Sequence, residues 1–510
     1  MDKQRVDAAA AADPFTATHY DAIVLGSGLV ECVLAAALAR AHRRVLLVDS
    51  RPFYGGNQAT LLPSELAVLG GGGAFATSLV EGAAEGVDLA RMQVDLAPLA
   101  VLARGQAVHV IAESGVARYL EFHAVEGAFF LDNGERPIEV PHTKSAVFTS
   151  QELSLVDKRQ LMRFLQAARV TAPDELDAGR ALAKPQNVAA AAAAATMAAA
   201  TSYEAYLSDD VGLSARLSRV VRFGVALLSS EQAHDAVGAQ QRVANYLAGI
   251  GRFGPTPFIA PAYGTGEVCQ AFSRLCAVYG GVCALDVRVA AVDADALAVE
   301  FAAGNGLPPR ISAGAIVVGD AMVDGTSLSA WWRPAAMEEV HLVVVADAPV
   351  LRTARACLVA PPTREGECAV HGLQLDWALG AVPKGRALLH LVTMGAPERR
   401  ADTVARLRRV AASIVVVGAA TTTATLQQVA LLVRRPCVPL ADAMPRHVFA
   451  AALPSAPDDE PLQFHMDAAF ARAKQLFETL CPGEPFLPPS QAELEARSEE
   501  AAEQSLDLVM

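Results

Sequence analysis

The sequence lacks an apolar segment long enough to cross a membrane. Its longest low-complexity apolar run, VAAAAAAATMAAA at residues 188–200, is mostly alanine. It is shorter than the roughly 20 residues that a spanning helix needs, and alanine inserts only weakly. The opening stretch, MDKQRVDAAAAADPF, has charged residues and no apolar core of a secretory signal. We therefore expect a soluble, cytosolic protein.

Cysteine pairs with C-x-x-C spacing are also absent, although the chain has eight cysteines. This usage is typical of a reduced cytosolic protein without a disulfide framework. Cys269, Cys276 and Cys283 lie seven residues apart. A metal or redox cluster is one interpretation of this spacing. We favour small buried side chains near one face of a helix and its exit, and we predict no metal site.

The common catalytic motifs are missing as well. The sequence contains no H-E-x-x-H, no G-x-x-x-x-G-K-[ST] and no G-x-S-x-G, and its eleven histidines are scattered. The net charge of −13 argues against a general nucleic-acid binder. We therefore predict no catalytic residues and no nucleic-acid partner.

A strand–turn–helix–strand unit opens the globular part of the chain. HYDAIVL predicts a strand over residues 20–25, LVECVLAAALARAH a helix, and RRVLLVDS a second strand that ends at Asp49. This order is typical of the first βαβ unit of a dinucleotide-binding fold. Gly26 and Gly28 occupy the first two positions of G-x-G-x-x-G/A, and Asp49 stands where an acid holds the ribose hydroxyls.

The third position of this motif holds Glu31 instead of a small residue. A carboxylate in the first helical turn interacts favourably with the helix dipole and stabilises the helix by about 0.3–1 kcal/mol. About 4 Å from a pyrophosphate, at an effective dielectric near 20, the same charge opposes binding by roughly 4 kcal/mol. We therefore predict that Gly26, Gly28, Glu31 and Asp49 form a structural turn without a cofactor. A flavin-dependent oxidoreductase remains the alternative.

The rest of the chain divides by its hydrophobic pattern. Residues 105–140 are strand-like, and the pattern becomes helical after Pro141. Ser154 with Asp157, and Thr201 with Glu204, have the spacing of capping boxes. The predicted organisation is a disordered leader (1–18), a discontinuous dinucleotide-fold domain (19–121 and 251–455), a helical insertion (122–250) and a partly ordered tail (456–510).

Several motifs in one order resemble a known superfamily. GSGLVE, VDSRPFYGG, ARYLEFHAVEGAFF and TPFIAPAYGTGEVCQAFSRLCAVYGG are similar to Rab GDP-dissociation inhibitors and Rab escort proteins, in register over about residues 20–285 and more weakly to about 490. VPHTKSAVFTSQELSLVDKRQLMRFL (140–165) and AKQLFETLCPGEPFLPP (473–489) resemble the escort branch. The resemblance implies an α/β fold: a FAD/NAD(P)-binding, GDI-like Rossmann-type domain with a mostly helical inserted domain, and no bound flavin.

The escort resemblance also implies a function. Such a protein binds newly made, GDP-bound Rab GTPases and presents them to the alpha/beta heterodimer of Rab geranylgeranyltransferase. It then carries the geranylgeranyl group on the Rab to a membrane, with which it associates transiently. It is a non-catalytic accessory subunit. A Rab GDP-dissociation inhibitor that recycles prenylated Rabs is the alternative within the superfamily.

The resemblance assigns two sets of site residues. The Rab-binding set is Tyr54, Gly55, Gly56, Glu267 and Arg274. The isoprenoid-binding set is Phe164, Leu165, Val221, Val225 and Leu228. Simpler interpretations stay open: Tyr54 could cover the glycine turn, Glu267 and Arg274 could be solvated helix charges, and the second set could be an ordinary helix core. Cys283 and Ala284 depart from the bulky residues common in the superfamily, so part of the Rab surface differs here.

Overall fold

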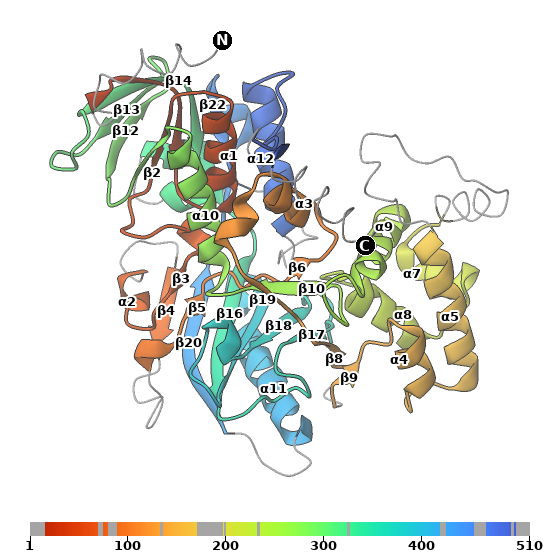
Figure 1. The fold of residues 1–510 in the computed structure, drawn as a ribbon. Helices are drawn as coiled ribbons and strands as arrows, with labels where there is room; N and C mark the ends of the chain where they lie inside the picture. Colours follow the sequence, from red (N-terminus) through yellow and green to blue (C-terminus); the bar gives the residue numbers. More distant parts are fainter. Residues whose placement is uncertain are drawn as a thin grey trace, which may run out of the picture.

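The computed structural model consists of two large sheets, with a group of helices beside the second sheet (Figure 1). The structure describes residues 16–69, 75–79, 89–132, 136–170, 197, 200–231, 235–323, 327–418, 425–452, 466–490 and 494–495. Within these residues no helix is both long and apolar enough to span a bilayer.

The first sheet contains the predicted βαβ unit. Its strands are β1 (His19–Leu25), β2 (Val45–Val48), β11 (Val282–Ala284), β12 (Val289–Asp293), β13 (Ala298–Phe301), β14 (Arg310–Val318) and β22 (Val448–Ala450). The order is β11-β2-β1-β14-β13-β12, and β22 pairs with β14. β1 runs parallel to β2 and β14, so Val24 lies opposite both Leu47 and Val317. The predicted strands and helix at the start of this domain are confirmed.

Three helices cover one face of the first sheet. They are α1 (Leu29–Arg40), α10 (Thr265–Val278) and α12 (Met466–Leu480). Their buried side chains share one core with Val24 and Leu47 of the sheet. Every residue of α1 is buried, because α10 and α12 both pack against it (Figure 1). Helix α12, from the C-terminal part of the chain, is thus a structural element of the first domain.

The second sheet is mostly antiparallel. Its strands are β4 (Phe75–Leu79), β8 (Gly127–Phe130), β9 (Ile138–Glu139), β16 (Glu338–Ala346), β17 (Ala356–Ala360), β18 (Val370–Leu375), β19 (Ala387–Gly395) and β20 (Leu426–Arg434). The order is β4-β20-β16-β19-β18-β17-β8-β9. Helix α11 (Arg400–Gly418) covers one face, where Leu407 and Ile414 pack on Leu342 and Leu391. The opposite face joins the core of the helical region.

The helical region lies beside β8 and β17 (Figure 1). It consists of α4 (Lys144–Thr149), α5 (Leu155–Val170), α7 (Tyr203–Ala205), α8 (Ala215–Arg219) and α9 (Ala236–Gly249), with π-helical turns at Tyr206–Asp210 and Val220–Val225. The Ser154–Asp157 capping box is confirmed, since each residue's backbone N–H reaches the other's side chain at 3.3 and 3.1 Å. At the second predicted box Ser202, not Thr201, caps the helix.

Smaller elements connect these parts. They are β3 (Thr60–Leu61), β5 (Val94–Asp95), β6 (Val101–Leu102), β7 (Phe122–Ala124), β10 (Phe258–Pro261), β15 (Trp332–Pro334), β21 (Cys437–Pro439), α2 (Leu66–Leu69) and α3 (Gln106–Glu113). β10 lies between β6 and β7, while β3 pairs with β5 and β15 with β21.

Two segments differ from the sequence pattern. Residues 106–113 were expected to be strand-like but form α3, because Ala107, Val110 and Ile111 recur at helical spacing and are buried. Residues 122–139, at the start of the expected helical insertion, form β7, β8 and β9. β8 joins the second sheet through β17, which comes more than 200 residues later.

Candidate functional site

The glycine turn between β1 and α1 is held from within the protein. Ser27 donates both its backbone N–H (2.8 Å) and its hydroxyl (2.6 Å) to Oδ2 of Asp49. The backbone N–H of Arg51 donates to Oδ1 of the same carboxyl at 2.9 Å. Gly26 has a φ of +112°, which favours glycine. Asp49, the acid expected to face a ribose, is buried and used to fix the turn.

Glu31 fills the space beside this turn. Its side chain is 5% exposed, and its carboxyl oxygens lie against the glycines around it. A Cβ atom on Gly28 would be 2.7 Å from Oε2, and one on Gly319 would overlap Oε1. Burial, with a contribution from Asp320, raises the Glu31 pKa to about 8. The sequence predicted a charged carboxylate, but Glu31 is mainly neutral at pH 7. Its carboxyl group packs against Gly26, Gly28 and Gly319, which have no side chains to exclude it.

The loop after β2 carries Tyr54 and the glycine pair. Gly55 and Gly56 have φ values of +104° and +52°, and a Cβ on Gly55 would lie 2.6 Å from Cα of Ala59. The N–H of Gly55 donates to the backbone oxygen of Ser27 at 3.0 Å, which ties this loop to the glycine turn. Tyr54 is half-buried against the core shared by α1 and α10, and burial raises its pKa to about 12.

Helix α10 carries the two predicted charged residues. Glu267 lies in its first turn, half-buried, and accepts a hydrogen bond from Gln270 at 3.1 Å. Burial raises the Glu267 pKa above its ordinary value. Arg274 is exposed, and its guanidinium carbon lies 4.4 Å from the centroid of the Tyr119 ring. This stacking fixes the direction of the Arg274 side chain.

The loop from Tyr54 to Thr60 runs along α10. Thr60 accepts a hydrogen bond from the N–H of Gly266 at the start of the helix (3.0 Å). Tyr54 packs against the core that contains Cys276, in the last turns of the same helix. The structure thus brings the predicted Rab-binding residues together along one helix, although they lie more than 200 positions apart in sequence. We call this loop and α10 the loop–helix surface.

The predicted isoprenoid-binding residues lie in one buried core. Phe164 and Leu165 come from α5, Val221 and Val225 from the π-helical turn, and Leu228 follows it. All five are at most 5% exposed and belong to the core that joins the helical region to the second sheet. They do not line an open groove.

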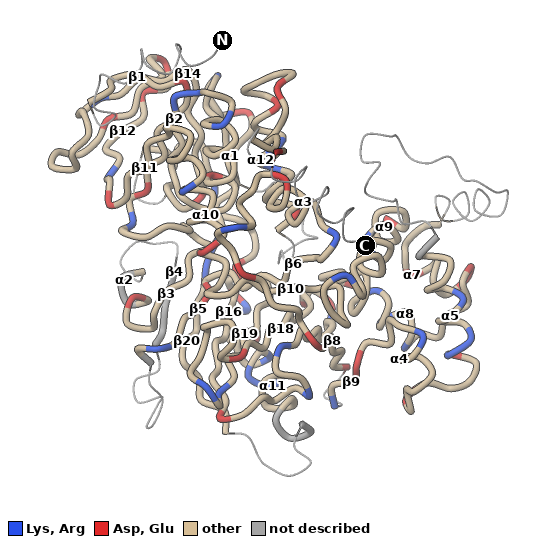
Figure 2. Tube along the Cα trace, in the orientation of Figure 1, with Lys and Arg blue, Asp and Glu red and all other residues tan. Residues whose placement is uncertain are grey.

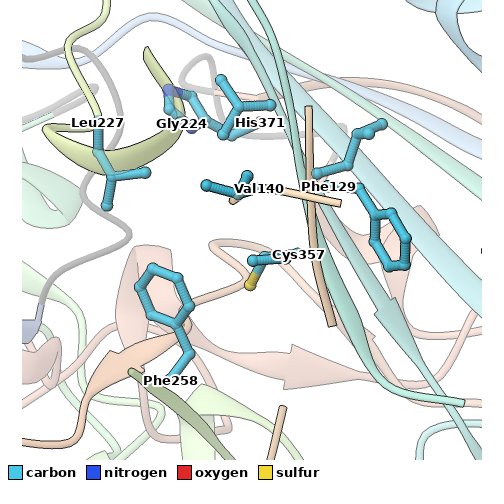
Figure 3. Close-up of a pocket in the computed structure, with 10 residues that line it drawn as sticks. Phe129, Val140, Gly224, Leu227, Phe258, Cys357 and His371 are labelled. Carbon is cyan, nitrogen blue, oxygen red and sulfur yellow. The ribbon is translucent and has the colours of Figure 1, made fainter. Parts of the chain in front are cut away.

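A small apolar pocket lies at the edge of this core (Figure 3). Its volume is about 10 Å³, room for about one water molecule. Its lining residues are Ala128, Phe129, Val140, Gly224, Leu227, Phe258, Cys357, Leu358, Val359 and His371. A Cβ on Gly224 would lie 3.4 Å from the side chain of Val140, an ordinary contact distance, so a methyl group would fit at this position. The pocket therefore lies between the helical region and the second sheet, next to Val225.

The structure also exposes an apolar patch that the sequence analysis does not single out. Phe148, Leu155 and Val156 are 67%, 85% and 65% exposed. Nζ of Lys158 donates to the backbone oxygen of Phe148 at 2.8 Å, which joins the end of α4 to the start of α5. Arg159 is exposed one turn beyond Leu155. We call Phe148, Leu155, Val156 and Arg159 the α4–α5 patch; Figure 2 shows basic positions along α5.

A sequence signal for this patch does exist. Leu155 and Val156 lie between the two residues of the capping box, Ser154 and Asp157. They fall outside the buried helical stripe of Leu161, Phe164 and Leu165. Elsewhere, Cys269 and Cys276 are buried on α10 and Cys283 is half-buried on β11. The described parts of the chain hold no group of three or more His, Cys, Asp or Glu arranged to bind a metal ion.

Solved structures share this fold. A Rab GDI from Plasmodium falciparum is 20% identical, with 92% of this chain and 100% of that chain covered and a TM-score of 0.66. An oxidoreductase from Methanosarcina mazei is 13% identical, with 90% and 99% covered and a TM-score of 0.54. A protein from Pyrococcus furiosus is 10% identical, with 91% and 98% covered and a TM-score of 0.53. The chain has the GDI fold, which is related to FAD/NAD(P)-binding Rossmann-like proteins.

The family follows from the sequence match. The family model described as GDI, GDP dissociation inhibitor, matches residues 16–305, which is more than half of the chain. The protein belongs to the GDP dissociation inhibitor family. This membership confirms the superfamily predicted from the motifs and agrees with a non-catalytic protein.

Proposed function

We propose that this protein is a Rab escort protein. It binds GDP-bound Rab GTPases before prenylation, presents them to the alpha/beta heterodimer of Rab geranylgeranyltransferase, and delivers the prenylated Rab to a membrane. Family membership supports Rab binding. The escort-like stretches at residues 140–165 and 473–489 support this branch over the inhibitor branch.

The loop–helix surface is the proposed Rab-binding site. It offers an aromatic side chain, Tyr54, and two charged ones, Glu267 and Arg274. Such a combination suits the polar surface of a folded GTPase, because aromatic and arginine side chains dominate binding energy at protein interfaces. The Arg274 side chain is held by Tyr119 before binding, so less conformational entropy is lost when the partner docks.

The α4–α5 patch is the observation that carries the escort assignment. An escort protein holds a Rab and a prenyltransferase at the same time, so it needs a second protein-binding surface. The patch has three large exposed apolar side chains flanked by Arg159, within the escort-like stretch 140–165. It lies in the helical region, away from α10 (Figure 1). We assign it to the prenyltransferase.

The isoprenoid is proposed to enter the helical region at the apolar pocket. Each buried methylene-sized group of a lipid contributes about 0.8 kcal/mol. The pocket is too small for a whole geranylgeranyl chain, so the chain must displace part of the core that contains Phe164, Leu165, Val221, Val225 and Leu228. Gly224 and the π-helical turn beside the pocket support this position, because π-helical turns occur frequently at functional sites.

A comparison of two Rab forms separates the escort and inhibitor branches. GDP-loaded Rab is titrated into the purified protein either unprenylated or geranylgeranylated, and the two dissociation constants are compared. An escort protein binds the unprenylated form tightly, because it must capture newly made Rab. A strong preference for the prenylated form, with extraction of Rab from membranes, supports an inhibitor. A yellow protein with bound flavin would instead favour the oxidoreductase.

A further inference from the structure

The end of helix α10 turns the chain back toward the helix. The N–H of Gly280 donates to Ala277 O (3.0 Å) and the N–H of Gly281 donates to Cys276 O (2.9 Å). With Gly280 at a φ of +87°, these two bonds form a Schellman motif. A Cβ on Gly281 would overlap Sγ of Cys276. The returning chain therefore passes directly over the Cys276 side chain.

This turn brings two thiols together. Cys283, in β11, follows Gly281 by two residues. The Sγ of Cys283 donates to the backbone oxygen of Ser273 at 3.7 Å, one turn before Cys276, so it lies against the part of α10 that carries Cys276. The two thiols interact with each other, and both are free. Cys276 is buried, whereas Cys283 is half-buried.

The contact makes the two thiols chemically unequal. The hydrogen bond from Cys276 lowers the pKa of Cys283, and the same bond, together with burial, raises the pKa of Cys276. The thiolate is the nucleophilic form of cysteine. The more accessible thiol of the pair is thus also the one that ionises more readily.

A second thiol pair in the same core provides a comparison. Cys32 of α1 and Cys269 of α10 also interact, but both are fully buried, and the Sγ of Cys32 donates to the backbone oxygen of Ser27 at 3.0 Å. Burial raises the pKa of Cys32 well above its ordinary value. The two thiol pairs thus differ in how accessible they are to solvent. Only the Cys276–Cys283 pair combines a contacting partner with a half-buried thiol.

We propose that Cys283 and Cys276 are a redox-active thiol pair that exchanges with small disulfides such as oxidised glutathione. The Cys283 sulfur attacks one sulfur of the small disulfide, whose S–S bond breaks and releases one glutathione. The Cys276 sulfur then attacks the Cys283 sulfur of the mixed disulfide and releases the second glutathione. The two cysteines lose two electrons, and their two protons end on the two released thiols.

The pair lies beside Tyr54. Tyr54 and Cys283 pack against the same core, which contains Cys276. A disulfide there would alter the support of this aromatic side chain. The thiol chemistry itself does not depend on the proposed function, so it can be tested without any Rab.

The test uses the full chain and oxidised glutathione. After incubation under native conditions, free thiols are alkylated, and the tryptic peptides are weighed. Residues 275–288 form one tryptic peptide that contains both cysteines. We expect this peptide to lose both alkyl labels and to be lighter by two hydrogens than the reduced peptide. Cys32, Cys269 and the half-buried Cys437 should remain fully alkylated.

Two variants define the order of events. Cys276→Ser should stop at a glutathione adduct on Cys283, whereas Cys283→Ser should give neither adduct nor disulfide. Thermal unfolding shows that each variant is folded. If a variant does not fold, the experiment on the native chain still tests whether the disulfide forms. An unmodified peptide 275–288, an adduct that never closes into a disulfide in the native chain, or modification of Cys437 first would overturn the proposal.

Discussion

The Arg274 guanidinium carbon lies 4.4 Å from the centroid of the Tyr119 ring. Arg274 belongs to α10, whereas Tyr119 ends a short 3-10 helix (Val116–Tyr119) that follows α3. The contact joins two of the sequence motifs that define the superfamily resemblance. It holds the arginine on the loop–helix surface and separates it from Glu267, its neighbour two turns away on α10.

Replacing Tyr119 should therefore weaken Rab binding without removing any predicted contact residue. An exposed cation–π contact contributes about 0.5–1 kcal/mol, so Tyr119→Leu should lower the affinity for GDP-loaded Rab about two- to fivefold. Tyr119→Phe keeps the ring and should bind normally. Isothermal titration gives the dissociation constants. The control is Phe253→Leu, which removes another aromatic ring beside an arginine, Arg252. Equal losses in the Leu and Phe variants of Tyr119 would contradict this role.

Glu31→Gln should change how stability depends on pH. The folded-state pKa of Glu31 is raised from 4.5 to about 8, so the native state keeps a proton that the unfolded state releases. The wild-type protein therefore loses stability as pH rises from about 4.5 to 8, by up to roughly 5 kcal/mol from this group. The neutral amide has no such dependence.

Urea unfolding at pH 5 and pH 8 measures this effect. The free energy of unfolding of Glu31→Gln minus that of the wild type should be larger at pH 8 than at pH 5, because only the wild type loses stability over this range. A difference between the two proteins that is the same at both pH values would show that Glu31 is already charged in the folded state.

Phe148→Ala should separate prenyltransferase binding from Rab binding. If Phe148 is a central residue of the interface, its truncation costs about 2 kcal/mol, which is roughly a thirtyfold loss of affinity for the heterodimer. Affinity for GDP-loaded Rab should be unchanged, because the patch lies outside the loop–helix surface. Val237→Ala, which removes an apolar side chain that is 50% exposed on α9, is the matched control. If Phe148→Ala bound the heterodimer with normal affinity, the α4–α5 patch would not be the prenyltransferase-binding surface.

Gly224→Leu should impair binding of the lipid but not of the protein. The leucine side chain would occupy the apolar pocket, so affinity for geranylgeranylated Rab should fall at least tenfold while affinity for unprenylated Rab stays the same. Gly224→Ala is the control, since its Cβ would meet Val140 and Phe130 at ordinary distances of 3.4 and 3.5 Å. Equal effects of Gly224→Leu on both Rab forms would indicate that the pocket does not accept the lipid.

The first sheet could be predicted because its signals are local. The glycines after β1, the apolar helix and the second apolar strand lie within about thirty residues, and each element has its own pattern. Residues 106–113 show the limit of such patterns. Their apolar positions fit a short helix as well as a strand, and the choice depends on packing against α12, which lies more than 350 residues later in the chain.

The second sheet and the state of Glu31 could not be predicted. β4 pairs with β20 so that Phe75 lies opposite Arg434, and no local pattern encodes such a distant register. The raised pKa of Glu31 depends on burial against Gly319 and on the charge of Asp320. Both residues directly follow β14, almost 290 positions after Glu31 in the sequence. The spacing of seven predicted Cys269, Cys276 and Cys283 near one face of a helix and its exit, and the structure places them there. The spacing did not predict the turn at the helix end that brings Cys283 back beside α10.

The most direct test of the escort assignment is geranylgeranyl transfer to an unprenylated Rab. GDP-loaded Rab, geranylgeranyl diphosphate and the purified transferase heterodimer are mixed with and without this protein, and lipid incorporated into the Rab is measured. The account predicts transfer that depends on this protein and is lost with Phe148→Ala. Transfer that is equally slow with and without the protein would contradict it.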